Sequence, residues 1–122
     1  MQYVDGFVLA VPAAKLDTYF EMARKASAVW LDHGALEYKE AVGEDLEVKG
    51  DMPFVSFSKM ANAKPDETVV FAWIVYESRA HRDAVNAKVM EDPRINEMCD
   101  PENMPFDCSR MAFGGFEVKV AA

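Results

Sequence analysis

The stretch Thr68-Val69-Val70-Phe71-Ala72-Trp73-Ile74-Val75-Tyr76 decides the fold, because it holds no charged residue and is dense in β-branched and aromatic side chains. Such a composition is typical of a β-strand. Side chains alternate between the two faces of a strand, so each face of this one is apolar. One face carries Val69, Phe71, Trp73 and Val75. The other face carries Val70, Ala72, Ile74 and Tyr76. We therefore expect both faces of this strand to be covered.

Other elements are predicted on both sides of this stretch. A second apolar run, Tyr3 to Val11, predicts a strand whose only charged residue is Asp5. Apolar residues at three- and four-residue steps then predict a helix that starts at Pro12 and ends at Gly34. Further expected elements are a strand over 35–42, a short extended piece over 52–57, a helical turn over 59–63, a helix over 79–91 capped by Ser78 and a last strand over 109–120.

This β-α-β-β-α-β order predicts a single domain over 1–122 of the α+β class, with a ferredoxin-like fold and a four-stranded antiparallel sheet. Right-handed crossovers lead us to expect the first and third strands in the middle of the sheet, parallel to each other. A chain of 122 residues is long enough to bury roughly two-thirds of its unfolded surface in a core.

Charge and composition restrict the partners and the location. The chain carries 13 basic and 21 acidic residues, a net charge of -8, which repels phosphate backbones and argues against nucleic-acid binding. No apolar stretch approaches the roughly 20 residues of a membrane span, so no membrane partner is expected. Two cysteines, Cys99 and Cys108, are too few for a disulfide scaffold, and no signal peptide is apparent before the first strand. We expect reduced thiols and a cytoplasmic location.

The two apolar faces of the central strands predict a homodimer. In a ferredoxin-like fold the helices cover only one face of the sheet. Leaving large apolar side chains of the other face in water would forfeit roughly 1.5–3 kcal/mol each. The simplest cover is the helix-free sheet face of a second copy, related by a two-fold axis. The alternative is that the segment 44–66 folds over that face.

Asp5 is the strongest candidate for chemistry, because a buried carboxylate needs a partner or a raised pKa. The first helix is expected to run antiparallel to the first strand, which returns His33 to the side of Tyr3 and Asp5. There Asp5 would orient His33 as a general base. The alternative is a structural hydrogen bond, or a histidine that only caps the helix C-terminus.

A second charged pair, Asp107 and Arg110, flanks the start of the last strand, and arginine can bind a carboxylate through two parallel hydrogen bonds. We expect this pair at the opposite end of the sheet from Asp5, near Tyr76 and Glu77, as a structural salt bridge that holds the C-terminal loop.

Trp30 and Trp73 are candidate walls of an apolar pocket between sheet and helices, with plain core packing as the alternative. The eight methionines are interpreted as packing residues. The soft ligands His33, His81, Cys99 and Cys108 match no zinc spacing, and Gly114-Gly115 matches no nucleotide-binding pattern. Neither a metal nor a cofactor is expected.

Several segments resemble one small bacterial family. They are residues 3–7, 33–35 and the stretch MPFDCSRMAFGGF at 104–116, joined by 68–74 and 78–93. The family is DUF1428, of unknown function, which includes the YbaA-like proteins. The resemblance covers nearly the whole chain and implies a ferredoxin-like subunit of the dimeric α/β-barrel superfamily. That superfamily holds cofactor-free monooxygenases, haem-degrading enzymes, lactone isomerases and proteins without known activity, so it selects no reaction.

Two functions follow from these observations. In the first, a homodimer binds a small, partly apolar molecule in a sheet–helix cleft, contacted by Tyr3, Trp30 and Trp73. His33 and Asp5 would act on it as in a cofactor-free monooxygenase or isomerase. In the second, the protein is a non-catalytic binding or stress-related homodimer. An open cavity of several hundred cubic ångströms that reaches His33 favours the first function, and a closed core favours the second.

Overall fold

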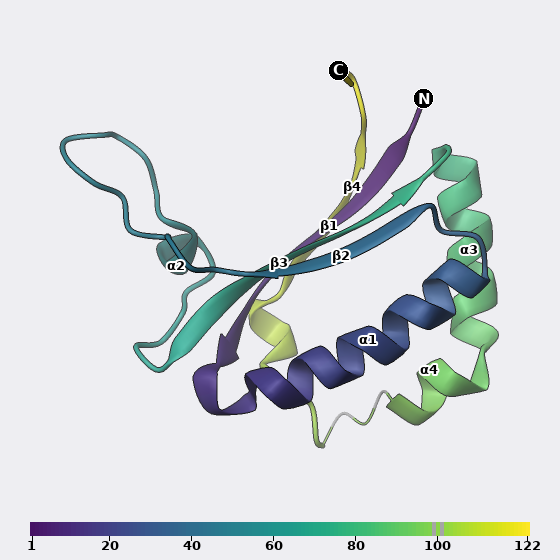
Figure 1. Ribbon diagram of the computed structural model, residues 1–122, viewed down its shortest axis with the longest axis horizontal. Coiled ribbons are helices and arrows are strands. Elements are labelled where there is room, and N and C mark those ends of the chain that lie inside the picture. Colours follow the sequence, from purple (N-terminus) through teal and green to yellow (C-terminus); the bar gives the residue numbers. More distant parts are fainter. Residues whose placement is uncertain (99, 101) are drawn as a thin grey trace.

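The computed structural model describes residues 1–98, 100 and 102–122 and shows a four-stranded sheet with its two long helices packed on one face (Figure 1). The elements are β1 (Tyr3–Pro12), η1 (Ala13–Lys15), α1 (Leu16–Asp32), β2 (Glu37–Val42), α2 (Phe57–Met60), β3 (Glu67–Tyr76), α3 (Arg79–Glu91), α4 (Pro93–Met98), η2 (Cys108–Arg110) and β4 (Ala112–Glu117). The α+β class and the ferredoxin-like order are confirmed. The prediction for Cys99 lies outside the described residues.

The strand order is β2-β3-β1-β4, and every neighbouring pair is antiparallel. The expectation that β1 and β3 run parallel is therefore wrong. The α1 crossover connects β1 to β2, and these two are the parallel strands, with β3 inserted between them in the opposite direction. Tyr3 consequently pairs with Tyr76, and Pro12 pairs with Glu67.

Local sequence signals set the helix boundaries. Gly34 follows α1 with φ +111°, a left-handed conformation that L side chains rarely adopt. The Ser78 side chain accepts a hydrogen bond from the backbone N–H of His81 at 3.1 Å and caps α3. No strand forms over the expected extended piece 52–57, and α2 begins at its last residue. None of the helices in the described part of the chain has both the length and the apolarity that a bilayer span requires.

The faces of β3 differ in what covers them. Val70, Ala72, Ile74 and Tyr76 face the helices and are at most 4% exposed. The other face of the strand is open, and Phe71 is 43% exposed there. Trp73 shares the Phe71 face, so its expected place in the sheet–helix cleft is wrong.

The helix-free side of the sheet carries a patch that we call the open face: Val4, Val8, Phe71, Trp73 and Phe116. The segment 44–66 covers only one end of this side, where the rings of Phe57 and Phe71 lie 6.0 Å apart. At that end Ala10 and Val69 are buried. Beyond it Phe116 is 63% exposed. The alternative in which the segment 44–66 folds over this face of the sheet therefore holds only at one end of the face.

The chain between β2 and α2 forms an arm, residues 43–56, that projects beyond the end of the sheet (Figure 1). Its side chains Met52, Phe54 and Val55 are 54–65% exposed. The two chain termini lie together at the other end of the molecule (Figure 1), where the N–H of Val118 donates to the carbonyl of Gln2.

Candidate functional site

A cavity of about 390 Å³ lies between the sheet and the helices; we call it the helix-side cavity. It forms where small residues oppose each other, Ala72 on the sheet and Ala23 and Ala26 on α1. Five of the eight methionines line it: Met22, Met90, Met98, Met104 and Met111. Two lining side chains, Met90 and Phe113, are 57% and 56% exposed, so the cavity opens to solvent beside them.

Strand register places two carboxylates on the floor of this cavity. Glu40 pairs with Ala72, which pairs with Phe7. Tyr38 pairs with Ile74, which pairs with Asp5, in the adjacent row on the same face. Two strand spacings of about 5 Å separate the strands of Glu40 and Asp5, and the two residues are also offset by two positions along the strands. They form two separate corners of one cavity.

The Glu40 corner is a carboxylate held by two phenols. The hydroxyl of Tyr19 donates to Oε1 of Glu40 at 2.5 Å, and the hydroxyl of Tyr38 donates to Oε2 at 2.8 Å. Tyr19 comes from α1 and is 5% exposed. None of the ion pairs among the described residues includes Glu40.

Burial raises the pKa of Glu40, and the hydrogen bonds from Tyr19 and Tyr38 oppose that shift only in part. The pKa values of both tyrosines are raised as well, first by burial and then by the neighbouring Glu40 charge. The phenols therefore remain protonated donors. Of the three groups at this corner Glu40 is the strongest acid, so proton exchange there takes place at its carboxyl group.

The Asp5 corner is an ion pair instead. Nη1 of Arg82, from the first turns of α3, lies 3.0 Å from Oδ1 of Asp5, and the side chain of Asp5 is 2% exposed. Burial raises the pKa of Asp5, and Arg82 acts against that shift. The guanidinium carbon of Arg82 lies 4.9 Å from the centre of the Tyr3 ring, which is a cation–π arrangement. Tyr3 is therefore a support of Arg82 outside the helix-side cavity.

Trp30 lines the helix-side cavity as expected. Its indole N–H donates to Oδ1 of Asn86 at 3.0 Å, and the hydroxyl of Tyr76 donates to the same oxygen at 3.3 Å. These bonds fix α1 against α3 above the sheet and leave one edge of the indole toward the cavity.

The structure does not bring His33 and Asp5 together, so the expected base–orienter pair is wrong. Nε2 of His33 lies 2.8 Å from Oδ2 of Asp92, at the junction of α3 and α4. Arg94 binds the same Asp92 carboxylate and also reaches Asp32 at 2.9 Å. His33 belongs to this ion-pair cluster and does not line the helix-side cavity.

Asp107 and Arg110 lie at the end of the sheet opposite Asp5. Nε of Arg110 is 3.1 Å from Asp107. Two further guanidinium nitrogens each lie 2.7 Å from an oxygen of Glu67, and the hydrogen bonds from Arg110 lower the pKa of Glu67 to about 2. The expected neighbours Tyr76 and Glu77 are wrong, because that placement assumed parallel β1 and β3. The antiparallel pairing brings Glu67, at the start of β3, to this end instead.

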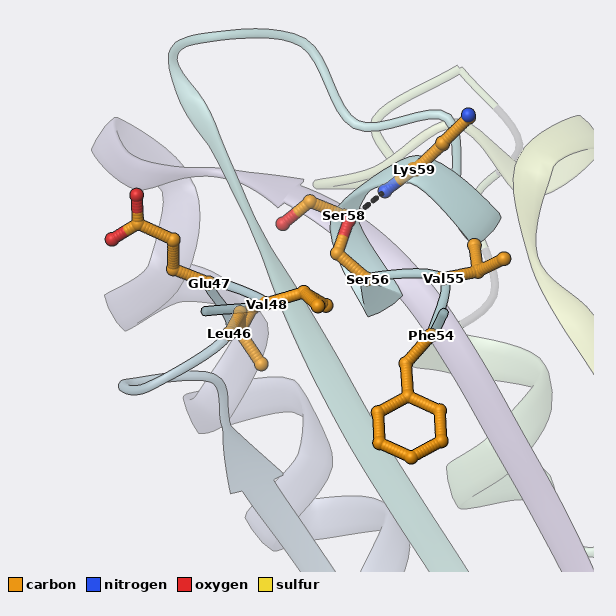
Figure 2. Close-up of a pocket in the computed structure, with 8 residues that line it drawn as sticks. All are labelled: Leu46, Glu47, Val48, Phe54, Val55, Ser56, Ser58 and Lys59. Atoms are coloured by element: carbon orange, nitrogen blue, oxygen red, sulfur yellow. Dashed lines mark hydrogen bonds between the residues drawn. The ribbon is translucent and has the colours of Figure 1, made fainter. Parts of the chain in front are cut away.

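Two other hollows lie outside the helix-side cavity. One, of about 610 Å³, is on the open face beside Trp73, where Gly6 and Gly114 pair with each other and the ring of Phe116 lies close to both. Phe7 and Phe113 line both this hollow and the helix-side cavity. Figure 2 shows the other hollow, lined from one limb of the arm by Leu46, Glu47 and Val48 and from the opposite limb by Phe54, Val55 and Ser56. Because one loop and its helical turn supply this entire lining, it is a surface feature of the arm.

Metal ligands do not converge within the described ranges 1–98, 100 and 102–122. No group of three or more His, Cys, Asp or Glu side chains in them is arranged to hold a metal ion. The thiol of Cys108 is free and exposed.

Sequence reasoning missed Glu40, Tyr19 and Arg82. A signal for Glu40 was present, because alternation puts it on the same face of its strand as Tyr38, where a charge needs a partner. A signal for Tyr19 lay in its place on the apolar stripe of α1. Arg82 carried no local signal, since its contact with Asp5 joins residues 77 positions apart.

The fold and the site together define an α+β protein of ferredoxin-like architecture with a cavity between its sheet and helices. The chain belongs to the DUF1428 family, described as a protein of unknown function, whose model matches residues 2–108. It is 48% identical over 117 residues to the uncharacterised protein YbaA of Escherichia coli (strain K12) and of Shigella flexneri, covering 96% of each chain. The predicted family is confirmed.

Solved structures of low identity share the fold. A NIPSNAP domain protein from Burkholderia xenovorans matches with a TM-score of 0.60 and 12% identity over 98% of this chain and 97% of its own. SnoaB, a cofactor-independent oxygenase from Streptomyces nogalater, matches with a TM-score of 0.57 and 12% identity over 98% of this chain and 95% of its own. A dimeric ferredoxin-like protein from an uncultured marine organism matches with a TM-score of 0.50 and 13% identity over 95% of this chain and 92% of its own. At these identities the likeness concerns the fold alone.

Proposed function

We propose that this protein binds a small, largely apolar molecule in the helix-side cavity, with Glu40 as the polar anchor. The observation that carries the proposal is a cavity of about 390 Å³ with an apolar lining and one hydrogen-bonded carboxylate that lacks an ion-pair partner in the described part of the chain. Ligand sites are typically apolar clefts of this size with a few polar groups that fix orientation.

The test uses the uncharged fluorophore N-phenylnaphthylamine, which becomes bright in apolar surroundings. We expect saturable binding with one fluorophore per chain. The variant Ala26→Phe fills part of the cavity from α1. It should weaken binding by about tenfold or more, because the fluorophore then buries less apolar surface against the cavity wall. Ala28→Phe is the matched control, because Ala28 is exposed on the same helix. Equal binding by the two variants, or no saturable binding by the wild type, would overturn the proposal.

A second candidate function is proton transfer catalysed by Glu40. The raised pKa of this partly buried carboxylate supports it, because a stronger base accepts a proton from carbon more readily. Similarity in fold to SnoaB, a cofactor-independent oxygenase, is consistent with chemistry in such a cavity without a bound group. In D₂O, the wild type should accelerate exchange of the carbon-bound protons of phenylacetone above the rate with Glu40→Gln. Equal rates would exclude this catalytic form for enolisable ketones.

We also propose a homodimer through the open face. Support comes from its apolar side chains, of which Phe71 and Phe116 are 43% and 63% exposed, and from the hollow beside Trp73, which has room for a side chain of a second copy. The dimeric ferredoxin-like protein of the same fold is consistent with this assembly. Sedimentation equilibrium at micromolar protein should give twice the chain mass of 13.7 kDa, and a lone chain would contradict it.

A cytoplasmic location completes the proposal. The free and exposed thiol of Cys108 supports it, since reducing compartments preserve such thiols. Fractionation of cells that make the tagged protein should recover it with the cytoplasmic enzymes, and recovery with secreted or envelope proteins would contradict this location.

A further inference from the structure

We infer that the ligand of the helix-side cavity carries a protonated amine and that the Glu40 carboxylate binds this ammonium group. The inference rests on the proposed function and adds the chemical class of the ligand: an apolar, preferably aromatic body that ends in a primary amine.

The charge balance of the cavity is the first argument. Among the described residues that line it, two are carboxylates, Asp5 and Glu40, and none carries a positive charge. Asp5 is neutralised by Arg82 at 3.0 Å. Glu40 has no corresponding cation in the described part of the chain, so the cavity holds one carboxylate whose charge is not compensated. A partly buried charge of this kind is less costly when a partner of opposite sign joins it.

The hydrogen-bond geometry at Glu40 is the second argument. An ionised carboxylate has about four lone-pair positions. Tyr19 and Tyr38 each occupy one position, on different oxygens. The remaining positions can accept hydrogen bonds and cannot donate them. A ligand group at this corner must therefore be a donor, and an ammonium group supplies three N–H donors together with the missing charge.

The surroundings suit a cation attached to an apolar body. Aromatic ring faces attract ammonium groups, and Tyr19, Trp30 and Tyr38 line the cavity around Glu40. The methionine side chains elsewhere in the lining adapt to apolar ligand shapes. An anionic ligand would meet the uncompensated Glu40 carboxylate inside a chain of net charge -8. The charge distribution thus disfavours carboxylate ligands of the same shape.

The experiment compares three ligands that share a phenylbutyl body and differ in their end group: phenylbutylamine, phenylbutanol and phenylbutyrate. Each competes with N-phenylnaphthylamine for the wild type, for Glu40→Gln and for the control Glu21→Gln, an exposed glutamate of α1. We expect the amine to bind the wild type about tenfold or more tightly than the alcohol, as a charge-assisted hydrogen bond predicts. We expect phenylbutyrate to be the weakest of the three.

In Glu40→Gln the advantage of the amine over the alcohol should fall to about twofold or less, and circular dichroism is the check that the variant is folded. Glu21→Gln should keep the full advantage. Equal affinities of amine and alcohol in the wild type, or an amine preference that survives in Glu40→Gln, would overturn the inference. If the wild type still binds the fluorophore saturably, such results leave the proposed function standing. If the wild type shows no saturable fluorophore binding, the proposed function itself is refuted.

Discussion

The two sides of the sheet differ in which kind of side chain is exposed to solvent, although the strands are apolar on both faces. On the helix side, polar groups are enclosed, and each is joined to another, as in the pairs of Asp5 with Arg82 and of Glu40 with its tyrosines. On the open face, apolar groups such as Phe71 and Phe116 are left toward solvent. This contrast supports the proposed small ligand on the helix side and the proposed second copy of the chain on the open face.

The largest expected effect concerns the ion pair of the helix side. Arg82→Met leaves the Asp5 carboxylate buried without its cation, and breaking such a pair costs about 3–5 kcal/mol in the free energy of unfolding. Urea denaturation measures it. The double variant Asp5→Asn/Arg82→Met should recover most of the loss, since no charge remains buried. A double variant as unstable as Arg82→Met alone would contradict the buried-charge explanation, and Arg79→Met on the exposed start of α3 is the control.

A charge on the open face should act on assembly and leave the fold intact. Trp73→Lys places an ammonium in the centre of the patch, and losing one buried aromatic contact in each subunit should raise the dimer dissociation constant about 100-fold. Sedimentation equilibrium measures this change, with circular dichroism as the check on folding. Leu31→Glu, at an exposed position of α1 away from the sheet, should leave the constant unchanged. A Trp73→Lys variant that remains dimeric would remove the open face as the interface.

The pH dependence of stability distinguishes two glutamates of opposite character. The pKa of Glu40 is raised above its usual 4.5, so the folded protein retains a proton that the unfolded chain has released, and this contribution to stability is lost as pH rises above 4.5. The pKa of Glu67 is lowered to about 2, so its contribution is present above 4.5 and is lost as pH falls toward 2. Glu40→Gln should therefore gain stability relative to the wild type with rising pH, and Glu67→Gln should approach the wild type with falling pH. Urea denaturation across this range gives both slopes, and equal slopes would contradict the assignment.

The smallest expected effect is that of His33, which lies outside the cavity. His33→Ala removes its hydrogen bond to Asp92 and should cost about 1 kcal/mol in the free energy of unfolding. Binding of N-phenylnaphthylamine should not change. If a stable His33→Ala variant no longer binds the fluorophore, His33 is part of the ligand site and its placement outside the cavity is contradicted.

The sequence predicted most of the main helices and strands, because their formation depends on local signals. Helix α3 has the predicted bounds, since the Ser78 cap and the Asp92-Pro93 stop act within a few residues. Alternation along residues 68–76 also divided the two faces of β3 correctly. It could not say which face meets the helices, because both sets are apolar, and Trp73 was consequently placed on the wrong side.

The site was less predictable because its contacts join distant segments. Antiparallel pairing of β3 with β1 returns the chain from Tyr76 to the side of Tyr3, and α3 begins there, so Arg82 lies over Asp5. Assuming parallel strands removed Arg82 from consideration and left His33 as the nearest partner. The cavity itself depends on the absence of side-chain volume at Ala23, Ala26 and Ala72, which becomes visible only when helix and sheet are placed together.

Phe7 and Phe113 belong to the walls of both the helix-side cavity and the hollow of the open face. An occupant that repositions either ring on one side alters the shape offered on the other. Thermodynamic reciprocity then requires that whatever factor a bound molecule applies to subunit association, association applies to the affinity for that molecule. For the proposed dimer, affinities measured at different protein concentrations would differ by up to that factor, and each titration would need the subunit concentration stated.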